Sequence, residues 1–187
     1  MKTLVSALTN ELKNIQATVL EKSNQVFLKI DKKDLLKTFR ILKENKNLQF
    51  WQLSELTALD YPESSSRFYM IYVLLSHKYN YRLIVRVPVK EKETVPSVTN
   101  IYQSANWFER ETFDMFGIKF INYPNLQRIL TEEGFEGFPL RKDFPTVGNS
   151  ELFYDETKED FVHKDISKPN ADVFSLDEFK NKEKLND

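Results

Sequence analysis

The sequence predicts an α+β domain in which helices pack on a mostly antiparallel sheet, followed by a long irregular C-terminal extension. Residues 67–76 and 81–89 are rich in β-branched and aromatic side chains and flank a short turn, which is typical of a β-hairpin. Residues 105–116 contain neither Gly nor Pro and carry apolar side chains at three- and four-residue steps, which indicates a helix. Beyond residue 145 charged and polar side chains dominate, and such a segment is too polar to build a core of its own.

The N-terminal part of the chain predicts two more helices and two strands. We expect one amphipathic helix over residues 3–21, packed on its own domain or on a partner. A short strand follows at 26–30, and Asp31 is placed to cap the next helix. Residues 48–59 have features of both a strand and a helix, and we interpret them as a strand. The apolar stripe of the first helix consists of Leu4, Leu8, Leu12, Ile15 and Val19.

The strand at 81–89 alternates strictly, so its two faces can be assigned. Four aliphatic side chains at every second position from Leu83 to Val89 point to one side, and Arg82 and Arg86 point to the other. The two arginines either meet acidic groups of a partner or lie on a solvated face of the sheet, and the alternation agrees with both interpretations.

Residues 104–145 hold seven of the fifteen Phe and three of the four Gly. Ser104 is a candidate N-cap for the helix at 105–116, and Gly117 is a candidate left-handed residue that ends it. Pro96 is placed to open a short helix before this segment, and residues 126–130 have the composition of one helical turn. A segment so dense in large apolar side chains and glycines is suited to packing against another surface.

Four charged residues cluster on that helix: Glu109, Arg110, Glu111 and Asp114. Arg110 and Asp114 are four residues apart, so we expect them to pair along the helix. The carboxylates have two interpretations. They form either a metal or acid–base site, or a polar seam neutralised by arginines. The second is favoured because the helix has no Glu-x-x-His and both histidines of the chain lie far away in sequence.

Charge and composition exclude several classes of function. The net charge is −1, so the sequence indicates no general attraction to nucleic acid. The chain has no cysteine, which removes disulfides, thiolate nucleophiles and Cys-ligated zinc or iron–sulfur clusters. It contains neither glycine-rich phosphate-binding motif. No apolar run approaches the roughly 18 residues of a membrane span, so any association with a membrane is expected through partners.

The charge is divided unevenly along the chain. Residues 1–145 carry 21 basic and 17 acidic side chains, whereas residues 146–187 carry 6 and 11. We therefore expect an α+β domain at 1–145 and an acidic extended C-terminal arm at 146–187. Aromatic side chains are spaced along the arm, which indicates that it becomes ordered by lying across its own domain or a partner.

Several segments resemble the 30-kDa subunit family of NADH dehydrogenase (respiratory complex I), of the mitochondrial subunit nine type. The resemblance lies in ERETFDMFGIKF, NLQRILTEEGFEG and PLRKDFP, and extends to LTALDYP and RFYMIYVLL, so it covers about residues 50 to 145. Tyr123 and Phe138 stand where the family usually has His, and Gln127 stands where it usually has a basic residue. The residues that match its motif are Glu109, Arg110, Glu111, Asp114, Gly117, Arg128, Gly134, Gly137, Arg141, Lys142 and Asp143.

The resemblance implies a structural subunit of proton-translocating NADH:ubiquinone oxidoreductase. It implies a place in the quinone module of the peripheral arm, where the chain braces the large subunit that helps to form the quinone site, beside the iron–sulfur subunits. It implies no catalytic, cofactor-binding or metal-ligating residue in this chain, with iron–sulfur clusters, FMN and quinone held by neighbours. The expected location is the matrix side of the mitochondrial inner membrane or, alternatively, the cytoplasmic face of a bacterial membrane.

The resemblance also implies roles for the matching residues. The charges of the helix fix it or its contacts, and those from Arg128 to Asp143 hold the following loop, partly on the large subunit of the quinone module. Two other functions are weighed against this one. One is the homologous subunit of a plastid NADH-dehydrogenase-like complex or a membrane-bound hydrogenase. The other is a small carboxylate-metal enzyme using Glu109, Glu111 and Asp114.

Overall fold

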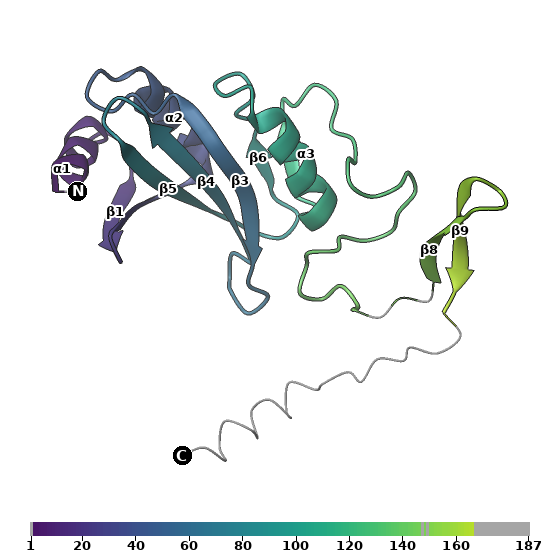
Figure 1. The fold of residues 1–187 in the computed structure, drawn as a ribbon. Coiled ribbons are helices and arrows are strands. Elements are labelled where there is room, and N and C mark those ends of the chain that lie inside the picture. Colours follow the sequence, from purple (N-terminus) through teal and green to yellow (C-terminus); the bar gives the residue numbers. More distant parts are fainter. Residues whose placement is uncertain (1, 147, 149, 167–187) are drawn as a thin grey trace, which may run out of the picture. The chain divides into compact units, whose positions relative to one another are not determined.

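A computed structural model describes residues 2–146, 148 and 150–166 of the chain (Figure 1). The chain divides into two compact units, Met1–Phe144 and Pro145–Asp187. The first contains a five-stranded sheet, three α-helices and a small two-stranded sheet, and the second contains a β-hairpin. The predicted α+β class, with helices on a mostly antiparallel sheet, is confirmed.

The large sheet has the strand order β1-β2-β5-β4-β3. Its strands are β1 (Ala17–Lys22), β2 (Gln25–Ile30), β3 (Gln52–Asp60), β4 (Phe68–Ser76) and β5 (Tyr81–Val89). Neighbours run antiparallel except β2 and β5, which run parallel with Val26 beside Leu83. The alternation predicted for β5 is confirmed, because every second side chain from Leu83 to Val89 is buried.

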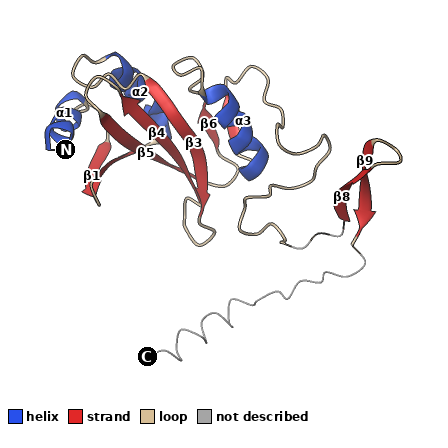
Figure 2. Cartoon of the chain, in the orientation of Figure 1, coloured by secondary structure: helices blue, strands red, loops and turns tan. Residues whose placement is uncertain are grey.

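Three helices cover the inner face of this sheet. They are α1 (Lys2–Glu11), α2 (Leu35–Glu44) and α3 (Ala105–Phe116), and a 3-10 turn at Lys32–Asp34 leads into α2. Asp31 caps that turn by accepting from the N–H of Lys33 at 3.0 Å. The ring of Phe39 on α2 meets the ring of Tyr72 on β4 edge to face, with centroids 5.0 Å apart. Figure 2 shows α2 behind strands β3 to β5.

Three local predictions were wrong. The helix expected over residues 3–21 ends at Glu11, and Val19 lies on β1, where it pairs with Leu28. Its first three leucines are buried as expected, but the stripe continues into a hairpin because Thr18 and Val19 are β-branched. Pro96 does not open a helix. It ends the short strand β6 (Thr94–Pro96), which pairs in parallel with β7 (Lys119–Ile121). Residues 126–130 form no helical turn.

The C-terminal unit contains one element that the sequence did not predict. Strands β8 (Ser150–Asp155) and β9 (Asp160–Asp165) form an antiparallel hairpin within the segment expected to be irregular. Tyr154 pairs with Phe161, and their ring centroids lie 5.3 Å apart, so these two aromatic side chains pack within the hairpin. The remainder of the expected arm, from residue 167, lies outside the described residues.

Candidate functional site

Helix α3 is fixed to the edge of the large sheet, and it organises the segment that follows it. Ser104 is the N-cap residue of α3 as predicted, but its hydroxyl donates to the carbonyl of Leu53 on β3 at 2.9 Å and makes no capping hydrogen bond, so that part of the prediction is wrong. Gly117 adopts φ 75° and ends the helix as predicted. Residues 122–144, called here the anchored loop, then contain no helix or strand and are held mainly by side chains.

Asp114, fully buried on α3, is the main anchor of this loop. Its Oδ2 accepts from the main-chain N–H groups of Ile129, Leu130 and Thr131 at 2.9, 2.7 and 3.0 Å. Its Oδ1 accepts from Arg128 at 2.7 Å and from the Thr131 hydroxyl at 2.5 Å. Burial alone would raise the pKa of the carboxyl, but the hydrogen bonds from Thr131, Ile129 and Leu130 outweigh it and hold the pKa far below its usual value.

Two arginines add further hydrogen bonds between helix α3 and the anchored loop, one from each side. Together with the bonds of Asp114 we call these contacts the clamp. Arg110 on α3 donates to the carbonyls of Gln127 and Arg128 at 3.2 and 2.9 Å. The predicted pair of Arg110 with Asp114 is therefore wrong, because Asp114 takes its cation from the loop. Arg128 also donates to the carbonyl of Gly137 at 3.1 Å and lies over the ring of Phe138. Helix and loop thus each contribute an arginine to the other's polar groups.

The end of helix α3 receives the second half of the loop. Arg141 donates from Nε to the carbonyl of Phe116 at 2.6 Å, and its guanidinium lies 4.4 Å from the ring centre of Phe138. A Cβ at Gly117 would lie 2.6 Å from both Arg141 and Phe138. The N–H of Leu140 donates to the carbonyl of Met115 at 3.1 Å. Gly117 therefore serves both its left-handed turn and the close approach of these side chains.

The last residues of the loop are tied to the large sheet through Asp60 and Arg67. Arg67 donates to Asp60 at 3.0 Å and reaches Asp143 at 2.8 Å. The N–H of Lys142 donates to the second oxygen of Asp60 at 2.8 Å. Arg67 also pairs with Glu91 at 2.9 Å. The pKa of Asp143 is lowered, chiefly by its bond to Arg67.

Glu109 is the second fully buried carboxyl of α3, and its surroundings differ from those of Asp114. Its Oε1 accepts from the N–H of Val98 at 2.7 Å, and its Oε2 has no hydrogen-bond partner. Burial raises the pKa of Glu109 to about 7, against the opposing effect of its bonds to Val98 and Ser97. Tyr72 of β4 faces the same region, and its hydroxyl is also buried without a partner.

The structure brings most of the predicted residues into one framework. The exceptions are Glu111, which is exposed, the side chain of Lys142, also exposed, and Gly134, which has no atom within 4 Å of a built Cβ. Among the described residues no three His, Cys, Asp or Glu side chains are placed to hold a metal ion. Glu109, Glu111 and Asp114 therefore do not form one carboxylate cluster.

Several residues of the framework were not predicted from the sequence: Asp60, Arg67, Glu91 and Thr131. Asp60 ends β3 and Arg67 directly precedes β4, its neighbour in the sheet. The segments LTALDYP and RFYMIYVLL contain them, so the resemblance of these segments to the family could have identified both residues as candidates. The hydroxyl of Thr131 donates to Asp114, but no pattern in the sequence around Thr131 predicts this contact.

Large apolar side chains of α3 and of the anchored loop are exposed to solvent. Trp107 is 67% exposed, Leu130 63% and Leu140 52%. Tyr123, which stands where a histidine was expected, donates to the side-chain oxygen of Asn106 at 2.8 Å. Exposed apolar side chains on a tightly held backbone suit the binding of another protein surface. In the part of the chain that the structure describes, no helix is long and apolar enough to cross a membrane.

Residues 28–150 match the family described as "Respiratory-chain NADH dehydrogenase, 30 Kd subunit". The matched range contains the large sheet from Leu28 onward, helix α3 and the whole anchored loop.

Curated relatives come from bacteria and from mitochondria. The chain is 49% identical over 126 residues to a subunit of the NADH-quinone oxidoreductase of Ruegeria pomeroyi, which is 67% of this chain and 63% of that protein. It is 48% identical over 132 residues to "NADH dehydrogenase [ubiquinone] iron-sulfur protein 3, mitochondrial" of Candida albicans, covering 71% and 47%. It is 46% identical over 142 residues to "NADH-ubiquinone oxidoreductase subunit 9" of Reclinomonas americana, covering 76% and 70%. The chain thus spans less than two thirds of the length of the first two.

Two solved structures share the fold. A trypsin-resistant fragment of Nqo5 is 26% identical and superimposes with a TM-score of 0.56, covering 66% of this chain and 99% of the fragment. A chain of the archaeal membrane-bound sulfane sulfur reductase superimposes with a TM-score of 0.66 at 22% identity, covering 78% and 86%. At that identity the second likeness concerns the fold alone.

Proposed function

The chain belongs to the family of 30 kDa subunits of respiratory-chain NADH dehydrogenase, and from this premise we propose that it is a structural subunit of proton-translocating NADH:ubiquinone oxidoreductase. In this proposal the chain lies in the quinone module of the peripheral arm and braces the large subunit of that module, beside the iron–sulfur subunits. The redox centres (iron–sulfur clusters, FMN and quinone) belong to those neighbours. Its place is the matrix side of the mitochondrial inner membrane, or the cytoplasmic face of a bacterial membrane.

The observation that carries the proposal is the rigid attachment of the anchored loop. Asp114 alone accepts five hydrogen bonds from loop residues, so a segment without regular structure is fastened to helix α3. A loop fixed in this way presents Leu130 and Leu140, beside Trp107 of α3, at low conformational cost, which favours tight binding of a partner. We assign this surface to the contact with the large subunit of the quinone module. The unit 1–145 then docks, and the segment 146–187 contributes further contacts.

The matching residues take supporting roles in this proposal. Arg110, Asp114, Arg128 and Arg141 shape the loop from within. Lys142 and Glu111, whose side chains are exposed, are free to meet charges of the partner. None of them acts on a substrate, so the chain contributes to the enzyme as a subunit.

Mass spectrometry of the native membrane assembly tests the proposal. The chain is purified after mild detergent extraction, and the assembly is separated on a native gel. Co-migration with the large subunit of the quinone module and with the iron–sulfur subunits is the expected result. Recovery of the chain alone, or with subunits of a plastid-type complex or a hydrogenase, contradicts it.

The two tryptophans of the chain supply a matched pair of variants for the docking surface. Trp107 is 67% exposed beside the anchored loop, and Trp51 is 56% exposed just before β3. Trp107→Ala is expected to release the chain from the assembly at detergent concentrations that leave the wild type bound, because large aromatic side chains dominate interfaces. Trp51→Ala is expected to stay bound. Equal release of both variants would argue against the assigned surface.

A further inference from the structure

The large sheet has a second face, called here the open face, which points away from the three helices. On the inner side, Tyr72 packs on Phe39 of α2, the leucines of α1 join the core, and Ser104 bonds to Leu53. Side chains of the opposite face remain half-buried or exposed, although they lie on the central strands. The open face is made by Phe27, Lys29, Tyr69, Ile71, Val73, Leu75, Arg82, Ile84, Arg86 and Pro88.

The strand register arranges these side chains in rows. Phe27, Ile84 and Val73 lie side by side on β2, β5 and β4 and form an apolar row through the centre of the sheet. The next row consists of Lys29, Arg86 and Ile71. On the other side of the apolar row, Arg82 lies beside Leu75. The apolar row is therefore flanked by cations on both sides.

These cations have no anionic partner among the described residues. No ion pair or side-chain hydrogen bond joins Lys29, Arg82 or Arg86 to a carboxylate of that part of the chain, whereas Arg67 and Arg128 are each paired with a buried aspartate. Arg86 lies 3.8 Å from the ring centre of Tyr69, and its Nε is buried without a partner. One acid, Glu55, stands on the open face, at the edge strand opposite Val73.

The stacking of Arg86 prepares it for a carboxylate. The hydroxyl of Tyr69 shares a hydrogen bond of 3.1 Å with Ser64, which holds the ring beneath the guanidinium. A guanidinium stacked on an aromatic ring is weakly hydrated, and its terminal nitrogens can match a carboxylate with two parallel bonds. Because the side chain of Arg86 is already held in place, it loses less conformational entropy when a carboxylate binds.

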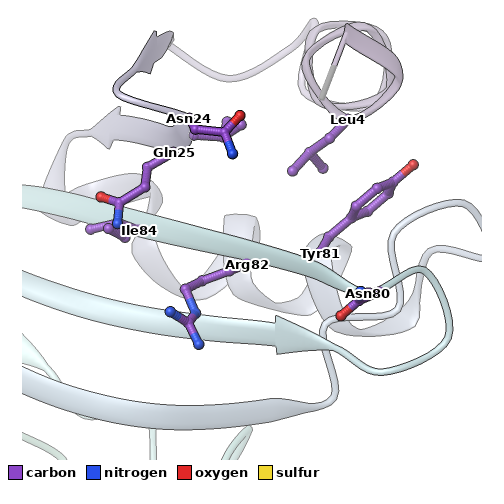
Figure 3. Close-up of a pocket in the computed structure, with 8 residues that line it drawn as sticks. Leu4, Asn24, Gln25, Asn80, Tyr81, Arg82 and Ile84 are labelled. Carbon is purple, nitrogen blue, oxygen red and sulfur yellow. The ribbon is translucent and has the colours of Figure 1, made fainter.

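A cleft of about 250 Å³ lies at the end of the sheet where β2 and β5 begin side by side, and residues of both faces line it, among them Leu4 of α1 and the open-face residues Arg82 and Ile84. Figure 3 shows Tyr81 reaching toward Leu4 of α1 while Arg82 points the opposite way. The carboxamides of Asn24, Gln25 and Asn80 line the same cleft and can bond to a main chain. The cations and the apolar row are thus bordered by groups suited to a polypeptide.

We propose that the open face is a second interaction surface, which binds an acidic segment of a partner protein. Carboxylates of that segment pair with Arg82, Arg86 and Lys29, and its apolar side chains cover the row centred on Ile84. A second copy of this chain does not fit, because a face-to-face pair would oppose like charges. The inference rests on the proposed function for the identity of the partner, which is another subunit of the same assembly.

Site-specific photocross-linking in the native assembly tests this surface. A photoreactive amino acid replaces Ile71 on the open face or, as control, exposed Lys37 on the outside of α2. The expected result is a cross-link from position 71 to one acidic segment of another subunit, identified by mass spectrometry, and none from position 37. A cross-link to a second copy of this chain, to lipid, or to nothing overturns the inference.

Charge reversal tests the chemistry of the contact. In the Ile71 cross-linking chain, Arg82→Glu is expected to reduce the yield at least tenfold, and the matched reversal Lys33→Glu is expected to leave it unchanged. Arg82 is exposed, so the fold is retained, which circular dichroism checks. An equal yield in both variants overturns the inference.

Two outcomes separate this inference from the proposed function. If the chain is found with the large subunit of the quinone module but gives no cross-link from position 71, the binding role of the open face is refuted and the proposed function is not. A chain found in a different assembly refutes the proposed function, while its cross-link to an identified acidic segment there still supports the open face. Vesicles containing anionic lipid provide the last arm, because binding of the purified chain that is lost in Arg82→Glu would assign the face to a membrane and overturn the inference.

Discussion

Asp114 and Arg128 are fourteen residues apart in the sequence, and their side chains meet at 2.7 Å. The aspartate is fully buried on helix α3, and the arginine belongs to a loop with no hydrogen-bonded strand or helix of its own. The pair gives this loop a fixed position that its backbone could not provide. The clamp therefore gives a defined course to a segment that is rich in Gly and Phe.

Asp114→Asn is expected to lower the free energy of unfolding by about 2–4 kcal/mol, because it leaves Arg128 and the three main-chain N–H groups of residues 129–131 without a charged partner. Urea denaturation measures the loss. Glu111→Gln, a neutralisation at an exposed position of the same helix, is the control and is expected to cost less than about 0.5 kcal/mol. Similar losses in the two variants would show that the buried clamp does not hold the loop.

Gly117→Ala and Gly134→Ala separate the two requirements for glycine. Both residues have positive φ, 75° and 86°, so each substitution is expected to cost about 1 kcal/mol of backbone strain. At Gly117 the new Cβ also meets Arg141 and Phe138 at 2.6 Å, whereas at Gly134 it meets nothing within 4 Å. The total loss at Gly117 is therefore expected to reach about 2–4 kcal/mol. Thermal unfolding of both variants checks the difference, and equal shifts would contradict it.

Glu109 makes the stability fall as pH rises. Its pKa is raised from 4.5 to about 7 in the fold, so the folded protein binds the proton more tightly than the unfolded chain. The protonated Glu109 side chain stabilises the folded state in full below pH 4.5, and this contribution is lost between pH 4.5 and about 7. The difference amounts to roughly 3 kcal/mol. Glu109→Gln is expected to flatten this part of the profile and to be more stable than the wild type at pH 8, as measured by urea unfolding at several pH values.

Arg67→Gln is expected to free the end of the anchored loop. The substitution leaves Asp60, whose side chain is almost fully buried, without its cation, and it releases Asp143. We expect a loss of about 3 kcal/mol and faster proteolytic cleavage near residue 143. Limited proteolysis with mass spectrometry locates the cut. Arg40→Gln, at an exposed position of α2, is the control, and a matching cleavage rate there would contradict the role of Arg67.

Features that depend on neighbouring residues were predicted well. The alternation of β5 and the limits of α3 come directly from side-chain periodicity, and the structure has both at the predicted positions. The first helix was overextended because the four- and three-residue spacing of Leu8, Leu12 and Ile15 looks the same whether or not the chain turns back after Glu11. Local sequence patterns contain no information about the pairing of Val19 with Leu28, which places Val19 on a strand.

The site was predicted as a set of residues but not as a set of contacts. Charged side chains on α3 suggested a pair within the helix, since four-residue spacing favours Arg110 with Asp114. The carboxylate instead accepts from three main-chain N–H groups of residues 129–131, and these bonds offset the cost of burying its charge, whereas an exposed pair within the helix would gain little. Burial of a charge depends on the folding of a distant loop, and no spacing rule within the helix contains that information.

The parallel contact between β2 and β5 has a consequence for how the chain is made. Strands β3, β4 and β5 can assemble by successive hairpins as they leave the ribosome, because each follows its partner directly. The hairpin of β1 and β2 is synthesised first, yet its inner neighbour β5 is translated long afterwards. Until then Val26 and Leu28 lie on an unpaired edge, the kind of nascent surface that aggregates or recruits chaperones. The pairing of β2 with β5 therefore has to wait until the intervening helix α2 and strands β3 and β4 have been synthesised.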